Sequence, residues 1–196
     1  NSGTALWDTT FYRPAAELPV NADTRQSLQD IFIFTARPYV KAVVFIDTPH
    51  RGAATADGWI GRLASAMITL PKAVKSVFGN MWLALTKDDI KPAMRSYMRG
   101  FGPNSVDVLS PRHPLVQQLN LLPLQVPVYS VIGNNRADRC ADFVTCPALN
   151  DSVVPYSSAH LPQAVAEYVV ASEHNSYQSV QAIEFISKIL SSDITF

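Results

Sequence analysis

Two acidic side chains and one histidine follow three apolar segments of this chain, and they are the groups best suited to chemistry. Asp47, Asp151 and His174 each come at or after the end of such a segment. A carboxylate that orients an imidazole, which in turn accepts a proton from a nucleophile, is the arrangement of a Ser-His-Asp hydrolase. The order of acid before histidine along the chain agrees with one known version of that arrangement.

Each of these residues also has a plainer interpretation. His174 could be an ordinary loop histidine near the start of a helix. Asp151 could serve only the turn that Asn150-Asp151-Ser152 predicts, a common use of aspartate. Asp47 competes with Asp151 as the acid, or it caps the turn that follows it or pairs with Arg51.

His50, Arg51 and Gly52 follow Asp47 in the turn after the first apolar segment, and His50 and Arg51 suggest either a catalytic or a phosphate-binding group. We expect instead a structural turn that packs and hydrogen-bonds beneath the site. His113 and His160 are expected to be ordinary polar residues. No spacing of His, Cys and Asp matches a zinc site, and no motif indicates a cofactor.

The elements that must position these groups alternate along the chain. Short apolar runs without alternation are typical of strands buried on both faces of a parallel sheet, and they occur at 41–47, 126–132 and 167–171. Helical periodicity occurs at 25–34, after a helix start at Asn21, within 53–100, at 114–122 and at 176–190. In the last of these segments Val180, Ile183, Ile186 and Ile189 are expected to form one apolar stripe. The pattern predicts an α/β fold with parallel strands and flanking helices. Functional groups then collect in the loops at the carboxyl ends of the strands.

Composition excludes several classes of protein. The 196 residues include 16 Lys and Arg against 16 Asp and Glu, so there is no basic surface for nucleic acid. With 47% hydrophobic and 16% charged residues the chain is neither disordered nor a coiled coil, and its length predicts one domain or most of one. No apolar run approaches the roughly 18 residues of a membrane span.

Three parallel strands are few for such a sheet, and the segment 41–47 would present a bare apolar edge. The chain begins with Asn1 rather than Met, without a basic and then apolar leader. We therefore expect a fragment or a processed product, the second half of a larger sheet.

Four segments, in order, resemble bacterial α/β-hydrolase lipases and esterases. They are VVFIDTPHRGA at 43–53, VYSVIG at 128–133, DSVVPYSSAHL at 151–161 and SEHN at 172–175. The resemblance implies that residues 1–196 are the C-terminal part of a single α/β-hydrolase domain, a partial fold of that family. It also implies that Asp151 is the catalytic acid, that His174 is the catalytic base, and that the segment at about 53–100 is a helical lid or cap. Ordinary core is the other interpretation of that segment.

The chain departs from the family at the nucleophile. None of its eight glycines frames a serine as Gly-x-Ser-x-Gly, so the nucleophile and the oxyanion hole are expected from a missing N-terminal half of the same protein. Ser152 stands where the family often has glycine, so the turn after the acid must accept a Cβ.

Cys140 and Cys146 precede the acid. A disulfide between them would brace its loop and imply an exported, periplasmic or membrane-associated bacterial protein. Two unpaired thiols, with a cytoplasmic location, are the alternative.

Together these observations predict part of a serine hydrolase for carboxylic or lipid esters, inactive alone and without a cofactor or metal. Two alternatives remain open: a non-catalytic binding module on a hydrolase-like fold, and a related acyltransferase.

Overall fold

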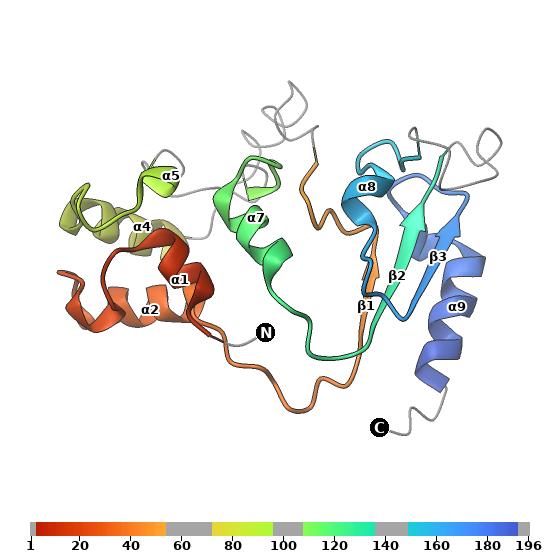
Figure 1. Cartoon of the computed structure of the whole chain (residues 1–196), viewed down its shortest axis with the longest axis horizontal. Coiled ribbons are helices and arrows are strands. Elements are labelled where there is room, and N and C mark those ends of the chain that lie inside the picture. Colours follow the sequence, from red (N-terminus) through yellow and green to blue (C-terminus); the bar gives the residue numbers. More distant parts are fainter. Residues whose placement is uncertain (1–2, 54–71, 96–107, 136–148, 192–196) are drawn as a thin grey trace. The chain divides into compact units, whose positions relative to one another are not determined.

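The computed structural model describes residues 3–53, 72–95, 108–135 and 149–191, shown in Figure 1. Its contacts divide the chain into two compact units, which are treated separately. The helical unit comprises Asn1–Arg37 and Ala54–Pro123, and the sheet unit comprises Pro38–Ala53 and Leu124–Phe196. The expected insert thus begins where the first part of the sheet unit ends.

The helical unit is built from short helices around one apolar core. Its described elements are α1 (Ala5–Thr10), η1 (Ala15–Glu17), α2 (Ala22–Phe32), α4 (Lys72–Ala84), α5 (Pro92–Arg95) and α7 (Pro114–Leu121). Asn21 begins α2 as expected, because its side chain accepts a hydrogen bond from Thr24 N–H. Trp7, Phe11 and Phe32 form an aromatic cluster at the centre of this core.

The described part of the expected lid contributes to the same core. Met81 of α4 and Met94 of α5 are fully buried and belong to one cluster with Leu6 and Leu28. For these side chains the ordinary-core interpretation therefore applies. Residues 54–71 and 96–100 of that segment lie outside the described residues.

The sheet unit contains the parallel sheet that the apolar runs predict. Its strands are β1 (Val43–Ile46), β2 (Val128–Gly133) and β3 (Ala166–Val170), in the order β1-β2-β3, and both pairings are parallel. β1 is therefore an edge strand, and no strand in the described ranges pairs with its outer side. The expected α/β arrangement with an open apolar edge is confirmed for this part of the chain.

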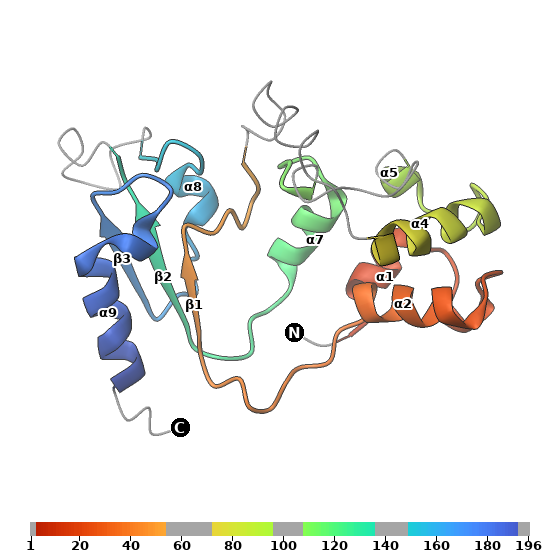
Figure 2. The same ribbon diagram turned by 180° about the vertical axis from the view of Figure 1, so that it is seen from behind.

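Helices lie on the two faces of this sheet (Figures 1 and 2). α9 (Val180–Ser191) packs Ala182, Phe185 and Ile186 against the face that carries Val131 and Val170. α8 (Tyr156–Ala159) follows the loop that carries Asp151, which we call the acid loop. It packs on the other face of the sheet, where Ile132 contacts Ala53, Val154 and Ala159.

The last helix begins later than predicted, and only half of its expected apolar stripe faces the sheet. A 3-10 turn, η3 (Ser176–Gln178), and an extended Ser179 precede α9. Of the stripe, Ile186 packs against the sheet and Ile189 is buried, whereas Val180 and Ile183 are 66% and 52% exposed. Because a helix turns about 100° per residue, steps of three residues drift by about 60° each, and Val180 lies opposite Ile189.

Candidate functional site

Asp151 and His174 meet at the end of the sheet where the parallel strands finish. The His174 Nδ1–H group donates to Asp151 Oδ2 over 2.7 Å, the direct hydrogen bond expected from the sequence. The two residues come from separate loops, one after β2 and one after β3. The Asp151 side chain is 2% exposed and the His174 side chain 42% exposed, so a buried acceptor holds an accessible ring.

Asp151 also organises its own turn. Its Oδ1 accepts hydrogen bonds from Val153 N–H (2.9 Å) and Val154 N–H (2.6 Å), while Oδ2 is left for His174. The two interpretations of Asp151 are therefore compatible, since one oxygen makes the turn and the other makes the pair. A carboxylate held by two backbone donors is fixed in direction before it contacts the imidazole.

The hydrogen bond determines which nitrogen of His174 is basic. An ionised carboxylate only accepts hydrogen bonds, so the neutral ring carries its proton on Nδ1. Nε2 then holds a lone pair, and no residue in the described ranges is bonded to it. This tautomer can accept a proton from a neighbouring hydroxyl or thiol.

Ser152 takes up the strained position of the acid loop. Its φ is +78°, in the left-handed region that favours glycine. Asn150 Oδ1 accepts from Ser152 N–H (2.9 Å), and the Asn135 amide donates to the Ser152 hydroxyl. The turn therefore accepts the Cβ of Ser152, with one local hydrogen bond from Asn150 and one contact from Asn135, which is distant in the sequence.

Asp47 is not the partner of the histidine. It is 4% exposed, and its carboxylate accepts from Gly133 N–H (2.7 Å), Ser176 Oγ–H (2.8 Å) and Ser176 N–H (2.9 Å). Of the two candidate acids, the one hydrogen-bonded to His174 is Asp151.

Gly133, the last residue of β2, allows the loops to converge. A Cβ at this position would lie 2.7 Å from Ser176 Oγ, 2.9 Å from Asp151 Cβ and 2.9 Å from the Glu173 carbonyl oxygen. Distances below 3 Å are sterically forbidden, so only glycine fits between the loops that carry the acid and the base.

The turn after β1 is joined to the segment that follows the acid. The Arg51 guanidinium donates to the carbonyl oxygens of Ser157 (2.8 Å) and His160 (2.7 Å). The Ser158 hydroxyl donates to the Gly52 carbonyl (2.6 Å) and accepts from Arg51 N–H (3.1 Å). These contacts agree with the structural turn expected for Arg51 and Gly52.

His50 packs edge-on against Phe45, with a ring-centroid distance of 4.5 Å. Burial, and secondarily the positive charge of Arg51, lower the pKa of His50 from 6.5 to about 4. Its Nε2 is buried without a hydrogen-bond partner among the described residues. The ring is therefore a neutral packing group near pH 7.

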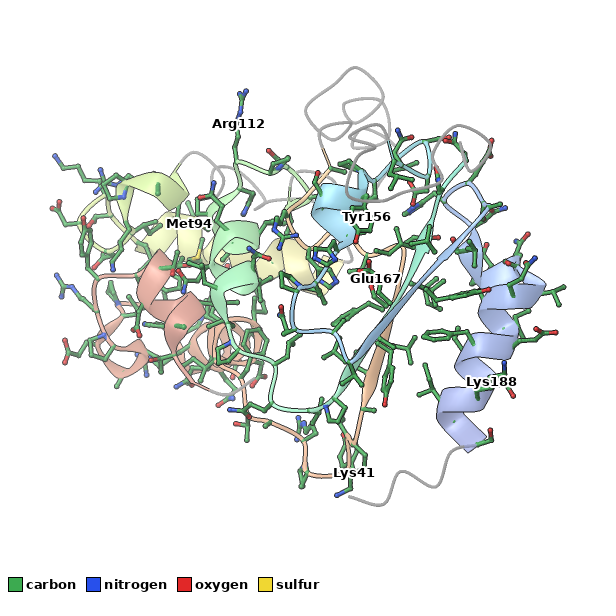
Figure 3. The ribbon with its side chains drawn as sticks, turned by 45° about the vertical axis from the view of Figure 1, so that its right-hand side comes forward. Lys41, Met94, Arg112, Tyr156, Glu167 and Lys188 are labelled. Atoms are coloured by element: carbon green, nitrogen blue, oxygen red, sulfur yellow. The ribbon has the colours of Figure 1, made fainter. Side chains whose placement is uncertain are left out.

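A second polar cluster was not anticipated from the sequence. Tyr156 Oη–H donates to Glu167 Oε1 (2.6 Å), and His160 Nδ1 lies 2.9 Å from Glu167 Oε2 and 3.1 Å from Tyr156 Oη. Tyr156 and Glu167 lie side by side in Figure 3. Burial and Glu167 raise the pKa of Tyr156 well above its usual range. The alternation of faces in β3 places Glu167 on the α8 side, but its partners could not be inferred from spacing.

Asp47, Asp151 and His174 have ligand-type atoms within 4.8 Å of one another. Their chemistry suits hydrogen bonding better than a metal ion, because backbone and hydroxyl donors already face three of the four carboxylate oxygens and the histidine faces the fourth. Cys140 and Cys146 lie outside the described residues.

Within the described ranges, no helix has the length and apolarity needed to cross a membrane. Comparisons of the chain with protein-family models, with curated proteins and with solved structures give no significant match.

Proposed function

We propose that this chain supplies the acid and the base of a serine hydrolase that cleaves carboxylic esters, including lipid-like esters. The observation that carries the proposal is the 2.7 Å hydrogen bond between His174 Nδ1 and the buried Asp151, with the ring 42% exposed. The ester class follows from the resemblance of the segments around Asp47, Asp151 and His174 to lipases and esterases.

In the proposed mechanism His174 Nε2 accepts the proton of a serine hydroxyl as the oxygen attacks the ester carbonyl. Asp151 holds the ring in the required tautomer and stabilises the imidazolium that forms. His174 then returns the proton to the leaving alcohol, and an acyl-enzyme remains. The same nitrogen activates water in the second half of the reaction, which releases the acid and regenerates the serine.

The serine is proposed to come from a segment outside these 196 residues, the N-terminal half of the same protein. The sequence contains no Gly-x-Ser-x-Gly turn. No strand among the described residues pairs with the outer edge of β1, so this edge could pair with a further parallel strand. A turn at the carboxyl end of such a strand would emerge at the same end of the sheet as His174.

The helical segment at about 53–100 is proposed as a lid or cap over an acyl pocket. Its apolar composition supports this role, because ester substrates with long acyl chains need apolar walls that exclude water. The described side chains of α4 and α5 that lie in the helical core would then stabilise such a lid from within.

An active-site-directed fluorophosphonate tests the proposal on the longest natural polypeptide that contains this chain. We expect labelling at one serine outside residues 1–196 and none on the 196-residue chain by itself. His174→Ala should lower ester turnover by several orders of magnitude. His160→Gln is the matched control, because this ring is similarly exposed (39%) but pairs with Glu167.

Two results would overturn the proposal. Absence of labelling in the long polypeptide would favour the non-catalytic binding module. Labelling of a serine within this chain would place the nucleophile elsewhere than proposed. If the acyl group passes to an added alcohol in preference to water, the same pair serves an acyltransferase rather than a hydrolase.

A further inference from the structure

Asp47 is a buried carboxylate that the proposed reaction does not use. Both of its oxygens are occupied, and all three donors belong to segments distant in sequence, at Gly133 and Ser176. Its backbone has φ +48°, a left-handed conformation that only a minority of non-glycine residues adopt. Burying an acidic group in a strained turn is costly unless its partners compensate.

The partners of Asp47 are the residues that place the acid–base pair. Gly133 ends β2 and lies against Asp151, since even a Cβ would not fit between them. Ser176 follows shortly after His174 in the same short loop and starts η3. One carboxylate therefore connects the end of β1, the end of β2 and the loop that carries the base.

We propose that Asp47 is a positioning residue for His174, which acts by fixing Ser176 and Gly133 so that the imidazole meets Asp151. Its importance for turnover rests on the function proposed above, whereas its effect on the His174–Asp151 hydrogen bond does not. Without this clamp (the contacts of Asp47 with Gly133 and Ser176), and apart from the His174–Asp151 pair itself, the loop 171–176 keeps one long-range bond, from Ser172 N–H to the Asn134 carbonyl (3.2 Å). Its other bonds are local, such as those of Ser172 with Glu173 and Asn175.

The geometry suggests a substitution that preserves shape. Asp47→Asn keeps the size of the side chain, and asparagine tolerates the left-handed region. If the amide oxygen continues to accept from Gly133 N–H and the Ser176 hydroxyl, the amide NH2 must face Ser176 N–H. Two donors then oppose each other, and the loop after His174 is displaced. Ser176→Ala is milder, because it removes the hydroxyl contact and retains the backbone one.

The hydrogen bond itself can be observed by proton NMR of the long polypeptide that contains this sequence (the parent chain). A histidine N–H held by a buried carboxylate should give a downfield resonance that exchanges slowly with water. We expect this resonance in the parent chain, its loss in His174→Gln and Asp151→Ala, its loss or broadening in Asp47→Asn, and a smaller change in Ser176→Ala. Glu184→Gln, an exposed carboxylate on α9, should leave it unchanged.

The outcomes separate the two proposals. If the parent chain lacks the resonance, the acid–base pair and the proposed function both fail. If the parent chain has it and Asp47→Asn retains it unchanged, only the role of Asp47 is refuted. Should Asp47→Asn not unfold cooperatively, Ser176→Ala decides, and an unaltered resonance there refutes the clamp.

In the long polypeptide that carries the nucleophile, Asp47→Asn should lower kcat on the order of 100-fold, the scale expected for a misplacement of about 1 Å. KM should change little, because the clamp does not touch the substrate. A rise in KM with kcat unchanged would contradict a positioning role.

Discussion

The Cα of Gly133 lies so close to Ser176 that a Cβ built on it would sit 2.7 Å from the Ser176 hydroxyl oxygen. The same Cβ would also press on Asp151 and on the backbone before His174. The end of β2 therefore works as the point against which the acid loop and the base loop are both packed. Glycine is required at position 133 because the two loops of the site pack against it, and not because its backbone conformation excludes other residues.

Gly133→Ala should accordingly damage both stability and the site. Overpacking of this kind costs about 1–3 kcal/mol, and the backbone oxygen of Glu173 cannot move as a flexible side chain could. Urea unfolding should show this loss, and the downfield resonance of His174 should weaken.

The matched control for that substitution is Gly79→Ala. Gly79 lies within α4, and a Cβ there would meet no atom within 4 Å. Because alanine is the better helix former, stability should rise by about 0.5–1 kcal/mol. Equal effects of the two substitutions would show that the close approach at Gly133 is unimportant.

The sheet and its chemistry differ in how far the sequence could predict them. Short apolar runs predict the places of β1, β2 and β3, although β1 is only half-buried along its length and β2 includes Tyr129 and Ser130. The pairing of Asp151 with His174 was expected from their places after successive strands and from the resemblance. The clamp of Asp47 was not, since it depends on hydrogen bonds to Gly133 and Ser176 across long sequence separations.

For the helices, the sequence predicts where an element lies but not which of its side chains enter the core. Periodicity predicts α9, but residues spaced by three drift around a helix by about 60° per step. Ile186 and Ile189 therefore face the core, while Val180 and Ile183 of the same expected stripe are exposed. Likewise, apolar spacing places Met81 on a helix without saying which core it enters. Its burial with Leu6 depends on contacts between segments far apart in the chain.

Ser152 offers a test of the strained acid loop. At φ +78° glycine relieves a strain of roughly 1–2 kcal/mol, but it also loses the contact with Asn135 and increases the entropy of the unfolded chain. These effects nearly cancel, so Ser152→Gly should stay within about 0.5 kcal/mol of the parent chain. Ser152→Val should destabilise by about 1–2 kcal/mol, because a β-branched residue is poorly tolerated there. Urea unfolding of both variants measures this, and equal stabilities would contradict the assigned strain.

We expect Arg51 to stabilise the folded chain through its hydrogen bonds to two carbonyl oxygens. Arg51→Ala leaves the Ser157 and His160 carbonyls without their charged donor and should cost about 1–3 kcal/mol in urea unfolding. Both bonds come from one guanidinium nitrogen, Nη1, so a lysine ammonium has enough donors, but its stronger hydration and more flexible stem should let Arg51→Lys recover only part of the loss. Full recovery by lysine would indicate that charge alone, rather than the rigid guanidinium plane, fastens the turn after β1 to α8.

His50 should make the folded state sensitive to mild acid. Its pKa is lowered to about 4 in the folded chain, whereas the unfolded value is near 6.5. Between these values the unfolded state binds the extra proton, so the free energy of unfolding is fully retained above pH about 6.5 and falls as the pH decreases toward about 4.

His50→Leu removes this group and should therefore show a smaller fall in melting temperature between pH about 7 and about 5. At neutral pH the variant should be at least as stable as the parent, because the buried Nε2 has no partner among the described residues. Parallel pH profiles for the two proteins would show that His50 is charged or solvated in the folded chain, contrary to its position against Phe45.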